Sequence, residues 1–180
     1  MRQHETSPVL HLDGVSAERQ SGRGTVRVVD QLTLSVAPGE LVALMGPSGS
    51  GKTSVLHLAS GLLAPTTGTV TVDGTMMNPT DRKAWATVRR RTVGMVHQRL
   101  DLLPGIDVRD NVALPLLLDG EKVRVAHDAA TAALERLGIT ELAPASPNEL
   151  SVGQQQLVAV ARAVVGNRRL VLADEPTAAQ

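Results

Sequence analysis

The sequence predicts an α/β fold with a mostly parallel core, an antiparallel sheet at its N-terminal end and a helical insertion. Three observations favour this class. Short apolar runs typical of buried strands alternate with helical segments, β-branched apolar stretches lie near the N-terminus, and helix-forming sequence dominates after Asp107. With 180 residues, 42% of them hydrophobic, the chain is long enough to bury a core.

The N-terminal part is predicted to form antiparallel strands. Residues 9–15 and 26–36 are rich in β-branched and apolar residues and flank a turn that contains two glycines. Residues 69–72 are expected to add a strand. Residues 41–45 form a short apolar run that ends in a glycine-rich turn, and a helix is expected at about 51–63. This region therefore has the predicted order strand, loop, helix.

The rest of the chain is predicted to alternate between helix and strand. Helices are expected at 80–91, at 123–137 before Gly138, and at 151–165, with strands at 92–96 and 170–173. Spacing places four apolar residues on one side of the last helix, namely Leu157, Val160, Ala161 and Val164. We expect one domain whose parts are a β subdomain with the first part of the core at 9–98, a helical subdomain at 99–165, and a final strand with the chain end at 166–180.

Charge and composition exclude several classes of function. Lysine plus arginine and aspartate plus glutamate are equal at 18 each, and binding to a phosphate backbone needs a basic surplus, so we expect no nucleic acid partner. The lack of cysteine excludes disulfides and thiolate metal ligands. The longest apolar stretch, at 112–118, contains Pro115 and is far shorter than the roughly 20 residues that cross a bilayer. Any membrane contact is expected to go through a partner.

The segment at 46–53 fits the pattern of a phosphate-binding loop between a strand and a helix. Its residues, which Ser54 follows, are Gly46, Pro47, Ser48, Gly49, Ser50, Gly51, Lys52 and Thr53. Glycines allow backbone N–H groups to surround phosphates, and the start of a helix adds partial positive charge. Lys52 supplies a charge for the β- and γ-phosphates, and the Thr53 hydroxyl is a suitable ligand for Mg²⁺. The alternative interpretation is an ordinary Gly-Ser turn.

An acidic pair, Asp174 and Glu175, follows the predicted buried strand at 170–173. Ligands of open α/β sheets bind at the C-terminal ends of strands, so one carboxylate can hold Mg²⁺ there and the other can polarise water. Taken alone, such a pair is more often a solvated turn. The phosphate-binding loop earlier in the chain favours the functional interpretation.

The run Leu-Ser-Val-Gly-Gln at 150–154 also has two interpretations. Ser151 and Gln154 match the Ser-x-x-Gln capping box of a helix start. The N-terminal end of a capped helix is also an anion site, so Ser151, Gly153 and Gln154 are candidates for binding a γ-phosphate. Both interpretations can hold together.

The order of these segments resembles that of the ATP-binding cassette (ABC) transporter ATPases, a class of P-loop NTPase. The phosphate loop, Gln98 in Val-His-Gln, the run at 150–154, and Leu-Ala-Asp-Glu-Pro-Thr at 172–177 follow in the order of that family. The resemblance covers about residues 9–177. Leu-Leu-Pro at 102–104 and Asn-Val-Ala-Leu-Pro-Leu at 111–116 are similar to its lipoprotein-release and macrolide-export branch.

The resemblance implies roles for individual residues. Lys52 and Thr53 bind the phosphates and Mg²⁺ of ATP, Asp174 supports Mg²⁺, and Glu175 is the general base. Gln98 reaches the metal and the γ-phosphate and links them to the membrane subunit, with a plain loop amide as the alternative. In the family, residues equivalent to Ser151 and Gly153 act on ATP held by the opposite protomer, which implies a head-to-tail dimer. The implied partner is an integral membrane permease, which holds the ATPase at the cytoplasmic face of the cell membrane.

Three residues depart from the family pattern: Arg19, Val152, and Leu157, which replaces the arginine usual after Gln-Gln-Gln. Arg19 occupies the place of an aromatic residue that stacks on adenine, so it either stacks through its guanidinium plane or is a surface arginine, with adenine then held by apolar contacts such as Val26. Val152 replaces the first glycine of the run at 150–154. If that position needs a positive φ or a close phosphate, a β-branched residue suits it poorly, and we predict weakened ATP-driven dimerisation.

A further departure is the end of the sequence. The family continues from Pro176 and Thr177 to an Asp and then to a strand ending in a His, and this sequence stops at Gln180. We therefore expect a cassette without the C-terminal part of its core, with strand edges left unpaired and with low stability or activity.

The predicted function is an ATP-binding subunit that hydrolyses MgATP to drive a separate permease. The alternative is a truncated, non-hydrolysing remnant or an incomplete fragment that at most binds nucleotide. A P-loop kinase or GTPase would explain the phosphate loop and Asp174, but it would not explain the run at 150–154.

Overall fold

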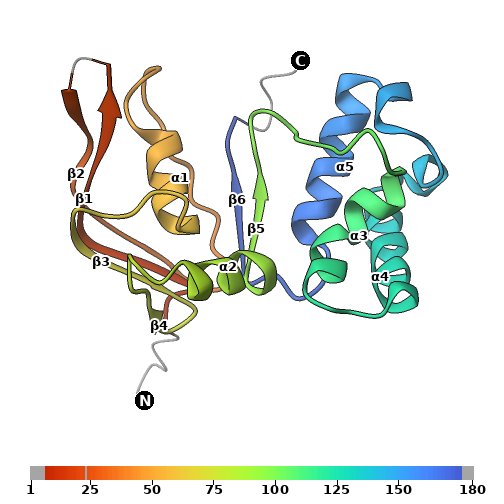
Figure 1. The fold of residues 1–180 in the computed structure, drawn as a ribbon, viewed down its shortest axis with the longest axis horizontal. Helices are drawn as coiled ribbons and strands as arrows, with labels where there is room; N and C mark the ends of the chain where they lie inside the picture. The colour runs from red at the N-terminus through yellow and green to blue at the C-terminus, as the bar shows by residue number, and fades with distance from the viewer. Residues whose placement is uncertain (1–6, 23, 176–180) are drawn as a thin grey trace. The chain divides into compact units, whose positions relative to one another are not determined.

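A computed structural model describes residues 7–22 and 24–175 of the chain (Figure 1). The chain divides into two compact units, residues 1–89 and residues 90–180, with the boundary inside helix α2 (Arg82–Arg91). Within the described residues, no helix combines the length and the hydropathy of a membrane span.

The first unit is built on an antiparallel sheet of four strands. The strands are β1 (Leu10–Ser21), β2 (Gly24–Val36), β3 (Thr67–Val72) and β4 (Thr75–Met76), in the order β2-β1-β3-β4. The predicted strands are confirmed, and β1 extends beyond its predicted end and β2 begins before its predicted start (Figure 1); Arg23, within the predicted turn, lies outside the described residues. The hairpin continues through pairs such as Glu18 opposite Arg27. The side chains of this pair are exposed, and hydrogen bonds between the two backbones hold the strand ends together.

Helix α1 (Lys52–Ser60) follows the phosphate loop, as predicted, and ends one residue before Gly61. Gly61 has a φ of 68°, and a Cβ there would lie 2.1 Å from the buried ring of Trp85, so both the backbone and the packing require glycine. The Nη1 of Arg89 donates to the carbonyl oxygens of Ser60 and Gly61 at 3.3 and 3.2 Å. A cation thus lies at the C-terminal end of α1, where the helix dipole favours it.

The segment at 41–45 is not a strand in the structure, contrary to the sequence prediction. Exposure alternates along it as in extended chain, but Leu41 and Met45 are 96% and 90% exposed. A strand needs a neighbour to complete its backbone hydrogen bonds, and no strand of residues 7–22 and 24–175 pairs with this segment. The prediction of a buried strand at 41–45 is therefore wrong.

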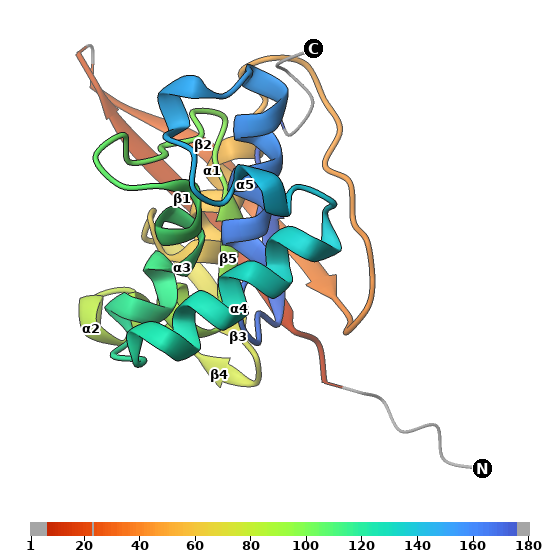
Figure 2. The same cartoon turned by 90° about the vertical axis from the view of Figure 1, so that its right-hand side faces the viewer.

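The second unit contains a parallel strand pair and three longer helices. Strands β5 (Val93–Val96) and β6 (Leu170–Ala173) run parallel, with Val93 opposite Leu170 and Val96 opposite Ala173. The helices are α3 (Val108–Leu118), α4 (Val123–Arg136) and α5 (Val152–Val164), with short 3₁₀ turns at Thr140–Leu142 and Pro147–Glu149. Figure 2 shows the three helices packed together. The predicted helices and strands of this half are confirmed, and Gly138 follows α4 with a φ of 67°.

Of the four residues predicted to share one side of α5, Ala161 is buried and Val160 and Val164 are partly buried. The buried residues of this helix are Val158, Ala159, Ala161 and Ala163, and Leu157 is exposed. The helix has two buried sides. One packs into the cluster formed with α3 and α4, and the other packs against Val96 at the end of β5. A helix covered on two sides has no single apolar stripe, which is why spacing alone identified only part of its buried surface.

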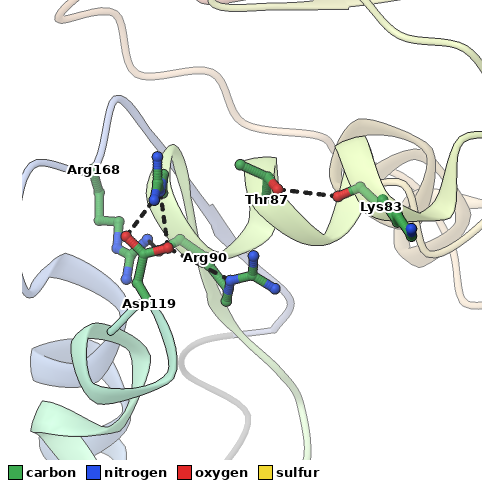
Figure 3. Close-up of polar contacts among 6 residues, drawn as sticks. Lys83, Thr87, Arg90, Asp119 and Arg168 are labelled. Atoms are coloured by element: carbon green, nitrogen blue, oxygen red, sulfur yellow. Dashed lines mark hydrogen bonds and ion pairs between the residues drawn. The ribbon is translucent and has the colours of Figure 1, made fainter. Parts of the chain in front are cut away.

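Asp119, which follows α3, forms ion pairs with Arg90 and Arg91 at the start of this unit (Figure 3). The Nε of Arg91 donates to both of its carboxylate oxygens at 2.8 and 2.9 Å, and the Nε of Arg90 lies 3.6 Å from Oδ1. The hydrogen bond from Arg91 holds the pKa of Asp119 below its ordinary value of 3.8. Arg168 lies beside them and donates to the carbonyl oxygen of Arg90.

Candidate functional site

The phosphate loop lies in the first unit and has the backbone that its glycines allow. Gly46, Gly49 and Gly51 have φ values of 156°, 79° and 93°, a region that other residues rarely adopt. A Cβ at Gly51 would lie 2.4 Å from the carbonyl oxygen of Val28, and one at Gly46 would lie 2.8 Å from the Oγ of Ser50. Glycine is therefore required for this path of the chain.

Lys52 points back into the loop that precedes it. Its Nζ donates to the carbonyl oxygens of Gly46 and Pro47 at 2.8 and 2.9 Å. Gly51 precedes α1 and has no side chain to cap the helix, so the partial positive charge of the helix end is left at the loop. The charged amine and the helix end together suit a polyphosphate, because both would interact with its oxygens.

The other predicted residues of the phosphate loop lie around Lys52 and the start of α1. Pro47, Ser48, Gly49 and Ser50 form the exposed turn, with the N–H of Ser50 donating to the carbonyl oxygen of Pro47 at 3.2 Å. The next two residues differ in exposure, since Thr53 is exposed and Ser54 is buried. Thr53 is thus on the accessible side of the helix start, as a metal ligand needs to be, and Ser54 packs inward.

The second unit brings Gln98 and the acidic pair together. Because β5 and β6 are parallel, their C-terminal ends lie at the same edge, and Gln98 follows one strand as Asp174 and Glu175 follow the other. The N–H of Asp174 donates to the carbonyl oxygen of Val96 at 2.9 Å, which continues the ladder. The Nε2 of Gln98 donates to the Oε2 of Glu175 at 3.0 Å. Residues 77 positions apart are therefore in direct contact.

Asp174 and Glu175 have different surroundings. Asp174 is 8% exposed, whereas Glu175 is exposed and has a φ of 47°. A left-handed backbone is unfavourable for a residue with a side chain and is found most often where function requires it. The turn directs two successive carboxylates into different environments, one enclosed and one open to water.

The capping box predicted for α5 is present. The N–H of Gln154 donates to the Oγ of Ser151 at 3.3 Å, and the N–H of Ser151 donates to the Oε1 of Gln154 at 2.9 Å. Ser151, Val152 and Gly153 are exposed at this helix end, and no described atom comes within 4 Å of a Cβ built on Gly153. The helix end is accessible to an anion.

Val152 does not strain the backbone. It is the first residue of α5 and is absent from the residues that have a positive φ, so a glycine is not needed there for conformation. The side chain is 55% exposed at the helix end. Val152 would therefore weaken ligand binding only through the bulk of its side chain, and not through backbone strain.

Arg19 lies in the hairpin opposite Val26, and its Nη2 is 3.4 Å from the Nδ1 of His57 on α1. Both Arg19 and Val26 are exposed. The guanidinium contacts a side chain of the helix that follows the phosphate loop. Stacking on adenine stays a prediction.

Two polar side chains near Gln98, the partly buried Arg162 and the buried Asn111, were missed from the sequence. Arg162 on α5 donates to the carbonyl oxygens of Leu100 and Asp101, and Asn111 on α3 bonds to the loop at Leu103. Each is a polar residue among apolar ones in a helix. That pattern was the available signal, because a buried polar group requires a specific partner.

The residues present fit a nucleotide and its metal ion by the chemistry of their donors. In the first unit the loop supplies an amine and a helix start for phosphate, and Thr53 supplies a hydroxyl; in the second unit Asp174 supplies a carboxylate, and both are oxygen donors of the kind that Mg²⁺ prefers. The described residues hold no group of three or more His, Asp or Glu side chains that could bind a metal by themselves. The remaining motif residues, Pro176 and Thr177, lie outside the described residues.

Comparison with known proteins gives a consistent family. A family model described as ABC transporter matches residues 29–178. The lipoprotein-releasing system ATP-binding protein LolD of Hyphomonas neptunium is 42% identical over 170 residues, which cover 94% of this chain and 75% of that protein. The uncharacterized ABC transporter ATP-binding protein YknY of Bacillus subtilis is 40% identical over 171 residues, 95% of this chain and 74% of that protein.

Solved structures show the same fold. The dimeric structure of MJ0796, a bacterial ABC transporter cassette, matches with a TM-score of 0.86 and 34% identity, covering 94% of this chain and 75% of that chain. The same protein in a post-hydrolysis state bound to ADP and Pi matches equally well. The residues that the family model matches, 29–178, include the phosphate loop, the run at 150–154 and the acidic pair. By sequence and by fold, the chain belongs to the ABC transporter family, as an ATP-binding cassette.

Proposed function

We propose that the chain binds and hydrolyses MgATP as the cassette subunit of a transporter whose membrane spans lie in a separate permease. The contact that supports hydrolysis most directly is the hydrogen bond between Gln98 and Glu175, which holds an exposed carboxylate at the end of β6. A carboxylate beside the γ-phosphate can accept a proton from water as the water attacks phosphorus.

The residues divide the work of the reaction in this proposal. Lys52 exchanges its carbonyl partners for phosphate oxygens and neutralises charge that develops during transfer. Glu175 orients water and accepts its proton, and Gln98 holds Glu175 in place. Thr53, Gln98 and Asp174 would hold Mg²⁺, which would withdraw charge from the phosphate when it is bound.

We also propose that two cassettes act together. The dimeric state of the similar structure and the exposed, capped start of α5 support this. Ser151, Gly153 and Gln154 would then offer their helix end to ATP held by the other protomer, with a two-fold axis relating the sites. The relatives that release lipoproteins favour a permease partner of that kind, at the inner face of the cell membrane.

A second candidate is nucleotide binding without hydrolysis. The exposed segment at 41–45 favours it, because this segment leads directly into the phosphate loop and no strand of the described residues pairs with it. The loop could still bind phosphate, since Lys52 and the helix start are local features.

One experiment separates the two candidates. Binding of a fluorescent ATP analogue and phosphate release are measured for the unsubstituted chain, Lys52→Ala and Glu175→Gln, each with its permease. Hydrolysis predicts that Glu175→Gln keeps nucleotide affinity and loses at least about a hundredfold in turnover, as removal of a general base does, while Lys52→Ala loses affinity. Binding by the unsubstituted chain with no phosphate release supports the second candidate.

A further inference from the structure

Arg162 links the helix of the capping box to the loop that carries Gln98. It lies near the C-terminal end of α5, and its Nη2 and Nη1 donate to the carbonyl oxygens of Leu100 and Asp101 at 2.6 and 2.8 Å. Burial lowers the pKa of the Arg162 guanidinium. A guanidinium withdrawn from water needs these acceptors, so the contact is a specific attachment rather than a surface pairing.

Helix α5 is also packed tightly on the strand that leads to Gln98. A Cβ on Gly94 of β5 would lie 1.7 Å from the carbonyl oxygen of Ala163, so strand and helix backbones are in direct contact. Val96 packs against Ala159 and Ala163. Arg162 extends this contact past the end of β5, because it binds the chain directly after Gln98.

The loop between these contacts has little freedom. Gln98 is two residues before Leu100, and Asp101 has a φ of 49°, which sets the direction of the chain. At the other end of α5, eleven residues before Arg162 and about 17 Å along the axis, is the capped start with Ser151. A single helix therefore connects the anion-accessible end to the loop of Gln98.

We propose that Arg162 is a positioning residue that ties the Gln98 loop to α5, so that displacement of this helix moves Gln98 and, through it, the Glu175 carboxylate. The inference rests on the proposed function, in which Glu175 is the general base. In this proposal, one continuous connection joins an anion bound at the start of α5 to the position of the base. The helix carries Arg162, Arg162 binds Leu100, and Gln98, two residues before Leu100, binds Glu175.

The kinetic test compares three variants of the full-length cassette with its permease. Arg162→Met keeps the length of the side chain and removes both donors, and Arg162→Lys keeps a charge that can reach one carbonyl oxygen. Arg124→Met on α4 is the matched control, because Arg124 is exposed in the same unit. We expect Arg162→Met to lower kcat about tenfold with KM for ATP within about twofold, Arg162→Lys to recover part of the loss, and the control to match the parent.

A spectroscopic test measures the loop directly. The chain has no cysteine, so Arg99→Cys places a single nitroxide label on an exposed residue next to Gln98, and Glu135→Cys on α4 is the control position. We expect Arg162→Met to increase the mobility of the label at 99 and to leave that at 135 unchanged. Where Arg162→Met does not fold, Arg162→Lys is measured in the same way, with a smaller increase expected.

The outcomes separate this inference from the proposed function. A label at 99 that is equally immobile without Arg162 overturns the inference, even if kcat falls. A mobile label with unchanged kcat overturns the link to Glu175. An unsubstituted cassette that binds ATP without turnover refutes the proposed hydrolysis, and the label then decides alone whether Arg162 positions the loop.

Discussion

Replacing Asn111 tests how the loop after Gln98 is held. Asn111 is 0% exposed, and its Oδ1 accepts from the N–H of Leu103 at 2.8 Å. Its Nδ2 donates to the carbonyl oxygens of Leu103, Ile106 and Asp107 at 3.0, 3.3 and 3.0 Å. Alanine would leave buried groups without partners, at about 1–3 kcal/mol each, and a small cavity. We expect Asn111→Ala to lose about 3–5 kcal/mol, a large part of the roughly 5–15 kcal/mol of a typical domain.

Asn111→Asp separates hydrogen bonding from packing, because it keeps the shape and reverses the donors. Its carboxylate can accept from Leu103 but faces three carbonyl oxygens that need a donor. We expect a loss at pH 7 at least as large as that of alanine. The folded state raises the pKa of this carboxyl above its unfolded value of about 3.9, so the loss shrinks as the pH falls through the raised value.

The assay is urea denaturation followed by circular dichroism at 222 nm, which reports on the helices, for the parent and both variants at pH 7 and pH 5. Comparison with the parent at each pH removes the contributions of other groups. Asn111→Asp with a midpoint equal to the parent at pH 7 would refute the reasoning, since it would show that the donors of Asn111 contribute nothing.

Three further substitutions test other features. Asp119→Asn removes a carboxyl whose pKa Arg91 lowers, so its deficit in Tm should be full above about pH 5 and should shrink as the pH falls below 3.8; a deficit that grows in acid would contradict the sign. Gly94→Ala should abolish folding of the second unit or lower its Tm by more than about 10 °C, because a Cβ there meets the backbone of Ala163. The control is Gly105→Ala, at a position with open space, which should change the Tm little. Val152→Gly should lengthen the lifetime of an ATP-bound dimer by removing bulk at an exposed helix end, and an unchanged lifetime measured by size exclusion would show that the side chain does not obstruct it.

Features that depend on short sequence patterns were predicted correctly. The phosphate loop was found because its glycines encode a backbone path that other residues rarely adopt, and the φ values at Gly46, Gly49 and Gly51 agree with that reading. The capping box of Ser151 and Gln154 was predicted from three-residue spacing, because both hydrogen bonds lie within one turn. The family was recognised from the order of such motifs, and the comparisons confirm it.

The burial of side chains and their contacts with distant segments were predicted less accurately. The apolar run at 41–45 predicted a buried strand, yet Leu41 and Met45 are exposed, because pairing depends on which strands are neighbours and not on the run itself. The buried surface of α5 was predicted only in part, because the helix is covered on two sides and the exposed Leu157 was grouped with buried residues. Both errors concern contacts between segments distant in sequence.

What the sequence by itself determined was the set of local chemistries: a loop for phosphate, a capped helix end and an acidic pair after a strand. Only the tertiary structure decided which side chains meet. Gln98 and Glu175 come into contact because parallel strands bring their C-terminal ends to one edge, and Arg162 reaches the Gln98 loop because Gly94 lets α5 lie directly on β5. Spacing along the chain specifies contacts within a few turns of helix, whereas contacts across 62 or 77 positions depend on how the elements pack.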